Sequence, residues 1–194
     1  MIINLFAILL AYLFGSISSA IIVCRLLKLP DPRTQGSQNP GATNVLRIGG
    51  KKAAAITLFG DVLKGLIAVV IAKWIGLTPL GIALVTLAVF LGHLFPIFFG
   101  FKGGKGVATF LGCILALSWP VGLAWLVDWL IVALIFRYSS LASLLASLLT
   151  PIYIWYLTHN LIYVLTTLLM SMVLIVRHRR NVGQLIKGEE RKIS

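Results

Sequence analysis

Residues 102–106, Lys-Gly-Gly-Lys-Gly, combine the residue types that commonly hold a phosphate group. Glycines let backbone N–H groups approach an anion closely, a lysine adds a full charge, and the apolar run that follows predicts a helix with a positive N-terminal end. The segment is not a nucleotide P-loop, because Gly104-Lys105 is followed by Gly106 where that motif requires Ser or Thr. The alternative is a plain turn whose lysines only orient the chain. The candidate ligands here are Gly103, Gly104, Lys105, Gly106 and Thr109.

A second polar segment, residues 25–52, is rich in proline and glycine and carries short donor side chains. Backbone N–H groups, hydroxyls and an arginine that converge in this way are typical of an anion-binding loop. The alternative is a solvated linker. The candidate phosphate ligands in this segment are Ser37, Asn39, Gly41, Thr43, Asn44 and Arg47.

Three ionisable residues lie inside apolar runs near these segments. Asp61 and Lys64 are three residues apart, on one face of a helix, and we expect them to form an internal ion pair that positions the helix. His93 is close in sequence to the glycine segment and is either a general base or a hydrogen-bonded structural group.

Another group of polar residues lies in the last third of the chain. His178, Arg179 and Asn181 directly follow an apolar run, and Ser140 precedes another. We expect them to close the same phosphate site. The alternative for the last segment is a basic amphipathic tail on an anionic lipid surface.

The elements that position these residues are membrane helices. The chain has 194 residues, of which 59% are hydrophobic and 11% charged, whereas a soluble domain is about a quarter charged. A bilayer core takes roughly 20 helical residues. The sequence therefore predicts an all-α, polytopic integral membrane protein in a single domain, residues 1–194. About seven spans are expected, some of them short, at 3–24, 53–72, 79–99, 107–118, 120–136, 141–157 and 161–176.

Positive charge gives the orientation. With the N-terminus outside, fifteen of the seventeen Lys and Arg residues fall on the inner side, Lys73 falls outside, and Lys64 lies within a span. Positive residues favour the cytoplasm, so we expect a cytoplasmic C-terminus. The net charge of +12 is then a topology signal, and nucleic acid is not an expected partner.

Two motifs of known acyltransferase classes do not occur in the sequence. No His is followed five positions later by Asp, since Phe98, Val164 and Gly183 occupy those positions, which excludes the acyltransferases that use such a pair. No Gly-x-Ser-x-Gly nucleophile elbow occurs either, so a covalent acyl-enzyme is not indicated. Phosphate loops beside lipid-facing helices indicate a substrate with phosphate and an acyl chain, or an anion in transit through a small transporter.

Five motifs in order carry a resemblance to a known family: GSQNPGATNVLR, DVLKG at 61–65, GH at 92–93, FPIFFGFKGGKGVAT and RHRRN. The chain resembles the PlsY family of bacterial acyl-phosphate:glycerol-3-phosphate acyltransferases along nearly its whole length. The family commonly has Gly where Gln38 stands. The resemblance implies acyl transfer from acyl-phosphate to the sn-1 hydroxyl of glycerol 3-phosphate, giving lysophosphatidic acid and phosphate in the bacterial inner membrane.

The resemblance also suggests roles for the candidate residues. We expect Ser37, Thr43 and the glycine segment with Lys105 to hold acyl-phosphate, and Arg47, Lys105, His178 and Asn181 to hold glycerol 3-phosphate. The base is either His93 or a phosphate oxygen of the substrate. No metal or cofactor is expected, membrane lipid surrounds the protein with its active site on the cytoplasmic side, and an enzyme that makes acyl-phosphate is a candidate partner. The expected catalytic residues are Lys105, His93, Ser37 and Asn181.

Overall fold

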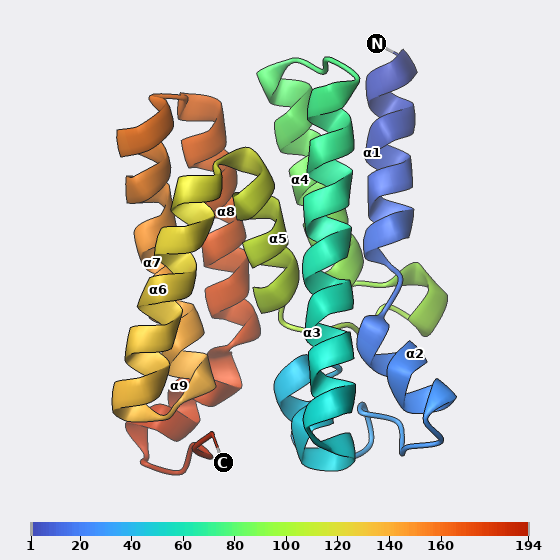
Figure 1. Ribbon diagram of the computed structural model, residues 1–194, viewed down its shortest axis with the longest axis vertical. Helices are drawn as coiled ribbons and strands as arrows, with labels where there is room; N and C mark the ends of the chain where they lie inside the picture. The colour runs from blue at the N-terminus through green and yellow to red at the C-terminus, as the bar shows by residue number, and fades with distance from the viewer. Residues whose placement is uncertain (1, 194) are drawn as a thin grey trace. The chain divides into compact units, whose positions relative to one another are not determined.

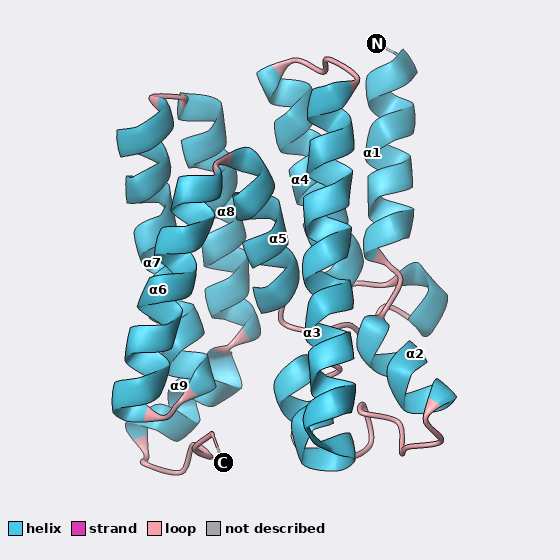
Figure 2. Ribbon diagram, viewed as in Figure 1, coloured by secondary structure: helices cyan, strands magenta, loops and turns pink. Residues whose placement is uncertain are grey.

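The computed structural model describes residues 2–193, which form helices joined by loops, with no strand in that range (Figures 1 and 2). The predicted all-α fold is therefore confirmed. The chain divides into two compact units, unit 1 up to Ala116 and unit 2 from Leu117 onward. The single domain stays a prediction, and each unit is described by itself.

In its described residues, unit 1 contains five helices and a single 3-10 turn. They are α1 (Ile2–Gly15), α2 (Ser19–Leu26), α3 (Ala42–Trp74), α4 (Pro79–Leu94), the turn Ile97–Phe99 and α5 (Val107–Leu117), whose last residue lies just beyond the boundary. Local sequence sets several helix starts. Ser18 caps α2 by accepting from the Ile21 N–H, and Thr78 caps α4 by accepting from the Gly81 N–H, with Pro79 at the first position.

Glycines let helices α1 and α4 of unit 1 pack backbone against backbone. A Cβ at Gly15 would overlap the Val89 carbonyl, and one at Gly92 would overlap the Tyr12 carbonyl. Small residues at such crossings allow dispersion contacts and weak polar contacts between the backbones. The crossing places the end of α4, and therefore His93, beside the α1–α2 junction.

Helix α3 begins earlier than the apolar pattern predicts. The segment 25–52 was expected to be one long connection, but residues 42–49 are helical and the loop is confined to residues 27–41. Gly50, at φ 76° and ψ −176°, then kinks the chain before the predicted span. The polar sequence Thr-Asn concealed this first part of the helix, because such residues are more typical of turns.

Up to residue 193, unit 2 contains four helices: α6 (Trp119–Phe136), α7 (Ser139–Thr158), α8 (Leu161–Arg177) and α9 (Arg179–Ile186). Helix α7 packs between α6 and α8. Polar bonds support this packing: Trp129 Nε1 donates to Ser143 Oγ at 3.0 Å, and Ser171 Oγ donates to the Ser147 carbonyl at 2.6 Å. The carboxylate of Asp128 accepts from the Tyr153 hydroxyl at 3.0 Å, which identifies a partner for it.

Every predicted span contains a helix, but the helices differ in their ability to cross a membrane. Within residues 2–193, four helices are long and apolar enough, or up to six spans are formed if the bent pairs α1–α2 and α8–α9 each count as one. Helix α5, with 11 residues, is too short for a typical bilayer. The membrane fold is thus supported, while the number of spans and the orientation of the termini stay predictions.

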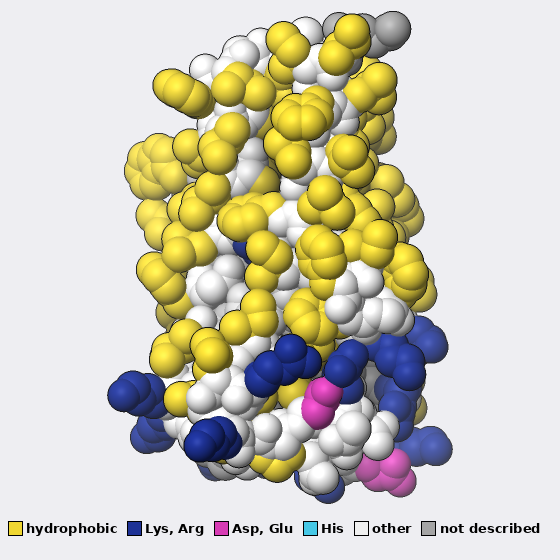
Figure 3. All heavy atoms as spheres, turned by 90° about the vertical axis from the view of Figure 1, so that its right-hand side faces the viewer, with side chains coloured by type: hydrophobic (Ala, Val, Ile, Leu, Met, Phe, Trp, Pro, Cys, Tyr) yellow, Lys and Arg dark blue, Asp and Glu magenta, His cyan; other side chains and the backbone are white. Residues whose placement is uncertain are grey.

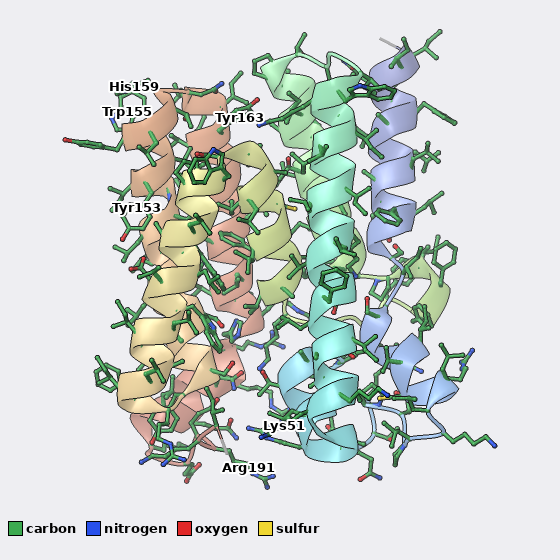
Figure 4. The ribbon with its side chains drawn as sticks, viewed as in Figure 1. Lys51, Tyr153, Trp155, His159, Tyr163 and Arg191 are labelled. Atoms are coloured by element: carbon green, nitrogen blue, oxygen red, sulfur yellow. The ribbon has the colours of Figure 1, made fainter. Side chains whose placement is uncertain are left out.

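Charged and apolar side chains separate along each unit. On the face of unit 1 that carries α1 and α2, apolar side chains cover most of the surface, and Lys and Arg gather at the α2 end (Figure 3). In unit 2, Trp155, His159 and Tyr163 lie at the α7–α8 turn, and Arg191 lies at the opposite end (Figure 4). Aromatic rings at one end and cations at the other are typical of helices that cross a membrane.

The glycine crossing of α1 and α4 gives a stability prediction. We expect Gly92→Ala to lower the free energy of unfolding by about 1–3 kcal/mol, because the new Cβ meets backbone atoms that cannot rotate away. The matched control is Gly183→Ala in α9, where no atom lies within 4 Å of the added Cβ. Thermal unfolding in detergent should show a lower midpoint for Gly92→Ala alone. Equal midpoints for the two variants would contradict the close crossing.

Candidate phosphate-binding site

The first loop, residues 27–41, is organised from within by the buried side chain of Asn44. Its Oδ1 accepts from the Ser37 N–H at 2.9 Å, and its Nδ2 donates to the carbonyls of Pro32 at 2.9 Å and Gln35 at 3.0 Å. Gly36 has a φ of 60°, and a Cβ there would overlap Asn44 Oδ1. Asn44, expected as a phosphate ligand, thus uses its amide to hold the loop that presents Ser37.

An arginine that the sequence analysis did not select ties the first loop to the segment before the glycines. Arg33 donates from Nε to Asp31 Oδ1 at 3.0 Å and from Nη2 to Asp31 Oδ2 at 2.6 Å, and its Nη1 donates to the Phe99 carbonyl at 3.2 Å. The side-chain hydrogen bonds from Arg33 lower the pKa of the Asp31 carboxyl below its ordinary value. The two-point interaction of Arg33 with the Asp31 carboxylate therefore persists at neutral pH, and it is lost as the pH falls and the carboxylate is protonated. The Asp-x-Arg spacing was its only sequence signal.

The glycine loop, residues 103–106, is held against the end of α4. The Gly104 N–H donates to the His93 carbonyl at 3.2 Å, and a Cβ at Gly103 would overlap the same carbonyl. Gly106 has a φ of 94°, and a Cβ there would overlap the ring of Phe90. These positions require glycine for space or for backbone conformation.

The first loop and the glycine loop meet in unit 1. A Cβ at Gly104 would lie 3.1 Å from the Pro40 carbonyl, so the two backbones are in contact at this point. Ser37 and Arg47 are exposed, and Asn39, Gly41, Thr43 and Lys105 are partly exposed. Gln38 has a φ of 58°, the left-handed region that favours glycine. Sequence-predicted donors of both segments therefore belong to one polar end of unit 1.

Beneath this end lie Asp61, Lys64 and His93, all buried. Lys64 Nζ is 3.0 Å from Asp61 Oδ1 and donates to the Ile17 carbonyl at 2.8 Å, and His93 Nδ1 is 3.6 Å from Asp61 Oδ1. The Thr109 hydroxyl is also buried and donates to the Asp61 carbonyl at 3.0 Å. Thr109, expected as a phosphate ligand, thus joins α5 to α3.

In unit 2, a carboxylate that the sequence analysis missed brings two predicted residues together. Ser140 Oγ and Asn181 Nδ2 donate to Glu190 Oε1 at 2.6 and 2.7 Å. His178 is buried, with Nδ1 2.8 Å from the Leu174 carbonyl, whereas Arg179 is exposed. The only signal for Glu190 was an acidic residue in a basic tail. Phosphate binding by Ser140, His178, Arg179 and Asn181 stays a prediction.

The role of the Asn44 amide can be tested by changing Asn to Asp at position 44 and, as a control, at position 160. We expect Asn44→Asp to lower the free energy of unfolding by about 1–3 kcal/mol, because the carboxylate cannot donate to the two loop carbonyls. The control is Asn160→Asp at the start of α8, where the side chain only accepts, from the N–H groups of Ile162 and Tyr163, and Asp caps as well as Asn. Thermal unfolding measures both. An unchanged midpoint for Asn44→Asp would mean that the loop does not depend on its amide.

Comparison with known proteins identifies the family of this chain. Residues 5–188 match the glycerol-3-phosphate acyltransferase family. Glycerol-3-phosphate acyltransferases of Thioalkalivibrio sulfidiphilus and Methylococcus capsulatus are 59% and 55% identical over 183 residues, which cover 94% of this chain and 90% and 92% of those proteins. The fold is similar to a crystal structure of PlsY (YgiH), an integral membrane glycerol 3-phosphate acyltransferase in its glycerol 3-phosphate form, with a TM-score of 0.94, 39% identity, and coverage of 98% of this chain and 96% of that one. This chain belongs to the glycerol-3-phosphate acyltransferase family and is an acyltransferase of the membrane.

Proposed function

We propose that this acyltransferase moves a fatty acyl group from acyl-phosphate to the sn-1 hydroxyl of glycerol 3-phosphate, giving lysophosphatidic acid and inorganic phosphate. The observation that carries the proposal is the contact between the first loop and the glycine loop at Pro40 and Gly104. It gathers donors suited to phosphate from two segments at one polar end of unit 1. Similar solved structures of PlsY are in a glycerol 3-phosphate form and a lysophosphatidic acid form, which supports the acceptor and the product.

The absence of two sequence motifs supports acyl-phosphate as the donor. The chain has neither a nucleophile elbow nor a His-x4-Asp pair. These are two motifs by which acyltransferases activate a more stable acyl donor. Acyl-phosphate is a mixed anhydride that already has a good leaving group, so positioning and charge suffice. Such a donor also brings a phosphate for the glycine loop to bind.

The reaction is one acyl transfer. The sn-1 oxygen attacks the carbonyl carbon of acyl-phosphate, a carbon–oxygen bond forms, and the bond to the phosphate oxygen breaks with its electron pair leaving on phosphate. The glycine loop and Lys105 hold that phosphate and stabilise the charge it gains. We assign Ser37 and Thr43 to the same phosphate, and exposed Arg47 to the phosphate of the acceptor.

The proton of the attacking hydroxyl goes to a phosphate oxygen of the donor. His93 is the side-chain alternative, but it is only 7% exposed and its Nε2 lies against Gly104, which favours the phosphate. We further propose that the basic end of unit 1 faces the cytoplasm of a bacterial inner membrane, in accord with the positive-inside rule. Both substrates are then reached from the cytoplasmic side.

The donor and the role of Lys105 are tested together. Purified protein in lipid is given glycerol 3-phosphate with either acyl-phosphate or acyl-CoA, and lysophosphatidic acid is measured. We expect product from acyl-phosphate. For Lys105→Ala we expect a loss of at least about 10²-fold in turnover, because the positive charge that stabilises the leaving phosphate is removed. The control is Lys102→Ala, an exposed lysine three positions earlier, which should keep near-normal turnover. Product from acyl-CoA alone, or normal turnover in Lys105→Ala, would contradict the proposal.

A further inference from the structure

The glycine loop depends on His93 in two ways. The His93 carbonyl accepts from the Gly104 N–H at 3.2 Å, and its ring lies so close to Gly104 that an added Cβ would overlap Nε2. The His93 ring therefore packs directly against the backbone of the glycine loop at Gly104. Any rotation of the imidazole would disturb Gly104 and with it the backbone conformation of the glycine loop.

The other side of the His93 ring faces a buried charge pair. Its Nδ1 is 3.6 Å from Asp61 Oδ1, and Lys64 Nζ is 3.0 Å from the same oxygen. Lys64 also donates to the Ile17 carbonyl at 2.8 Å, between α1 and α2. Asp61 and Lys64 are 2% and 3% exposed. A line of side chains therefore runs from the α1–α2 junction through α3 and α4 to the glycine loop.

We propose that Asp61, backed by Lys64, is a positioning residue that sets the His93 ring and through it the phosphate-binding shape of the glycine loop. The inference deepens the proposed function and rests on it. The carboxylate favours the imidazole tautomer with its proton on Nδ1, so that the ring keeps one orientation and Nε2 faces the loop. His93 acts as support for acyl-phosphate binding, and the proton of the reaction does not pass through it.

A pair of carboxylate variants tests the positioning role. We expect Asp61→Asn to raise the KM for acyl-phosphate roughly tenfold with kcat and the KM for glycerol 3-phosphate within about twofold, as when uniform binding is lost. The control is Asp128→Asn in α6, a second carboxylate of an apolar helix, for which all three constants should stay near wild type. Because Asp61→Asn leaves Lys64 as an unpaired buried charge, the neutral double variant Asp61→Asn/Lys64→Met is measured beside it.

Exchanging side-chain size between Gly104 and His93 distinguishes a supporting role of His93 from a role as general base. Gly104→Ala pushes its Cβ into the His93 ring, and we expect the KM for acyl-phosphate to rise roughly tenfold or more. The double variant His93→Ala/Gly104→Ala has room for that methyl group and should recover part of the lost affinity. If His93 is instead the base, His93→Ala alone loses about 10² to 10⁴ in kcat, and the double variant keeps that loss in kcat. That result would overturn the proposal.

The same variants are also measured without turnover, as the Kd of a non-hydrolysable acyl-phosphonate. A roughly tenfold weaker Kd in both Asp61 variants, with Asp128→Asn unchanged, is the expected result. Wild-type affinity in the Asp61 variants would overturn the positioning role even if lysophosphatidic acid is formed as proposed. Failure of the wild-type protein to form that product from acyl-phosphate would instead refute the proposed function, while the Kd comparison still decides the role of Asp61.

Discussion

A glycine loop can present its N–H groups to an anion only while other parts of the protein hold its backbone. Glycine has the greatest conformational freedom of any residue, so ordering the loop costs more entropy than ordering most segments. In unit 1 the end of α4 supplies the order, through the His93 carbonyl and ring, and the Pro40 carbonyl of the first loop also lies close to Gly104. The close crossing of α1 and α4 fixes this end of α4, and the buried pair of Asp61 and Lys64 lies beside its His93 ring.

Polar residues in this apolar chain divide into those that are available to bind and those that support them. Ser37 and Arg47 are exposed, whereas Asn44 and Thr109 are buried and bonded to backbone groups. Each buried polar group has a cost that only a hydrogen bond offsets. A polar loop beside lipid therefore needs further polar residues that hold its backbone, and the ion pair of Asp31 and Arg33 is one example.

The sequence was informative where a pattern is local. Apolar runs located a helix for every expected span, and glycine spacing located a loop that the structure holds against α4. Hydrogen-bond partners that are far apart in the sequence could not be predicted from it. The carbonyls that Asn44 satisfies lie 9 and 12 residues away, Arg33 reaches Phe99 66 residues on, and Glu190 meets Ser140 across 50 residues. Residue types alone did not show that Asn44, Thr109 and Ser140 bond to other parts of the protein, because a short polar side chain has the same sequence signal whether it binds a ligand or supports a loop.

In the proposed mechanism, the glycine loop, positioned by His93, holds the phosphate of the acyl donor. The most direct measurement is an experimental structure of the protein in lipid with a bound acyl-phosphonate. We expect the phosphonate to lie at the glycine loop beside the Lys105 ammonium, with the Gly104 N–H still bonded to the His93 carbonyl, the acyl chain leading toward the apolar helices and the His93 ring against Gly104. A phosphonate bound elsewhere while the glycine loop contacts no phosphate would contradict this mechanism.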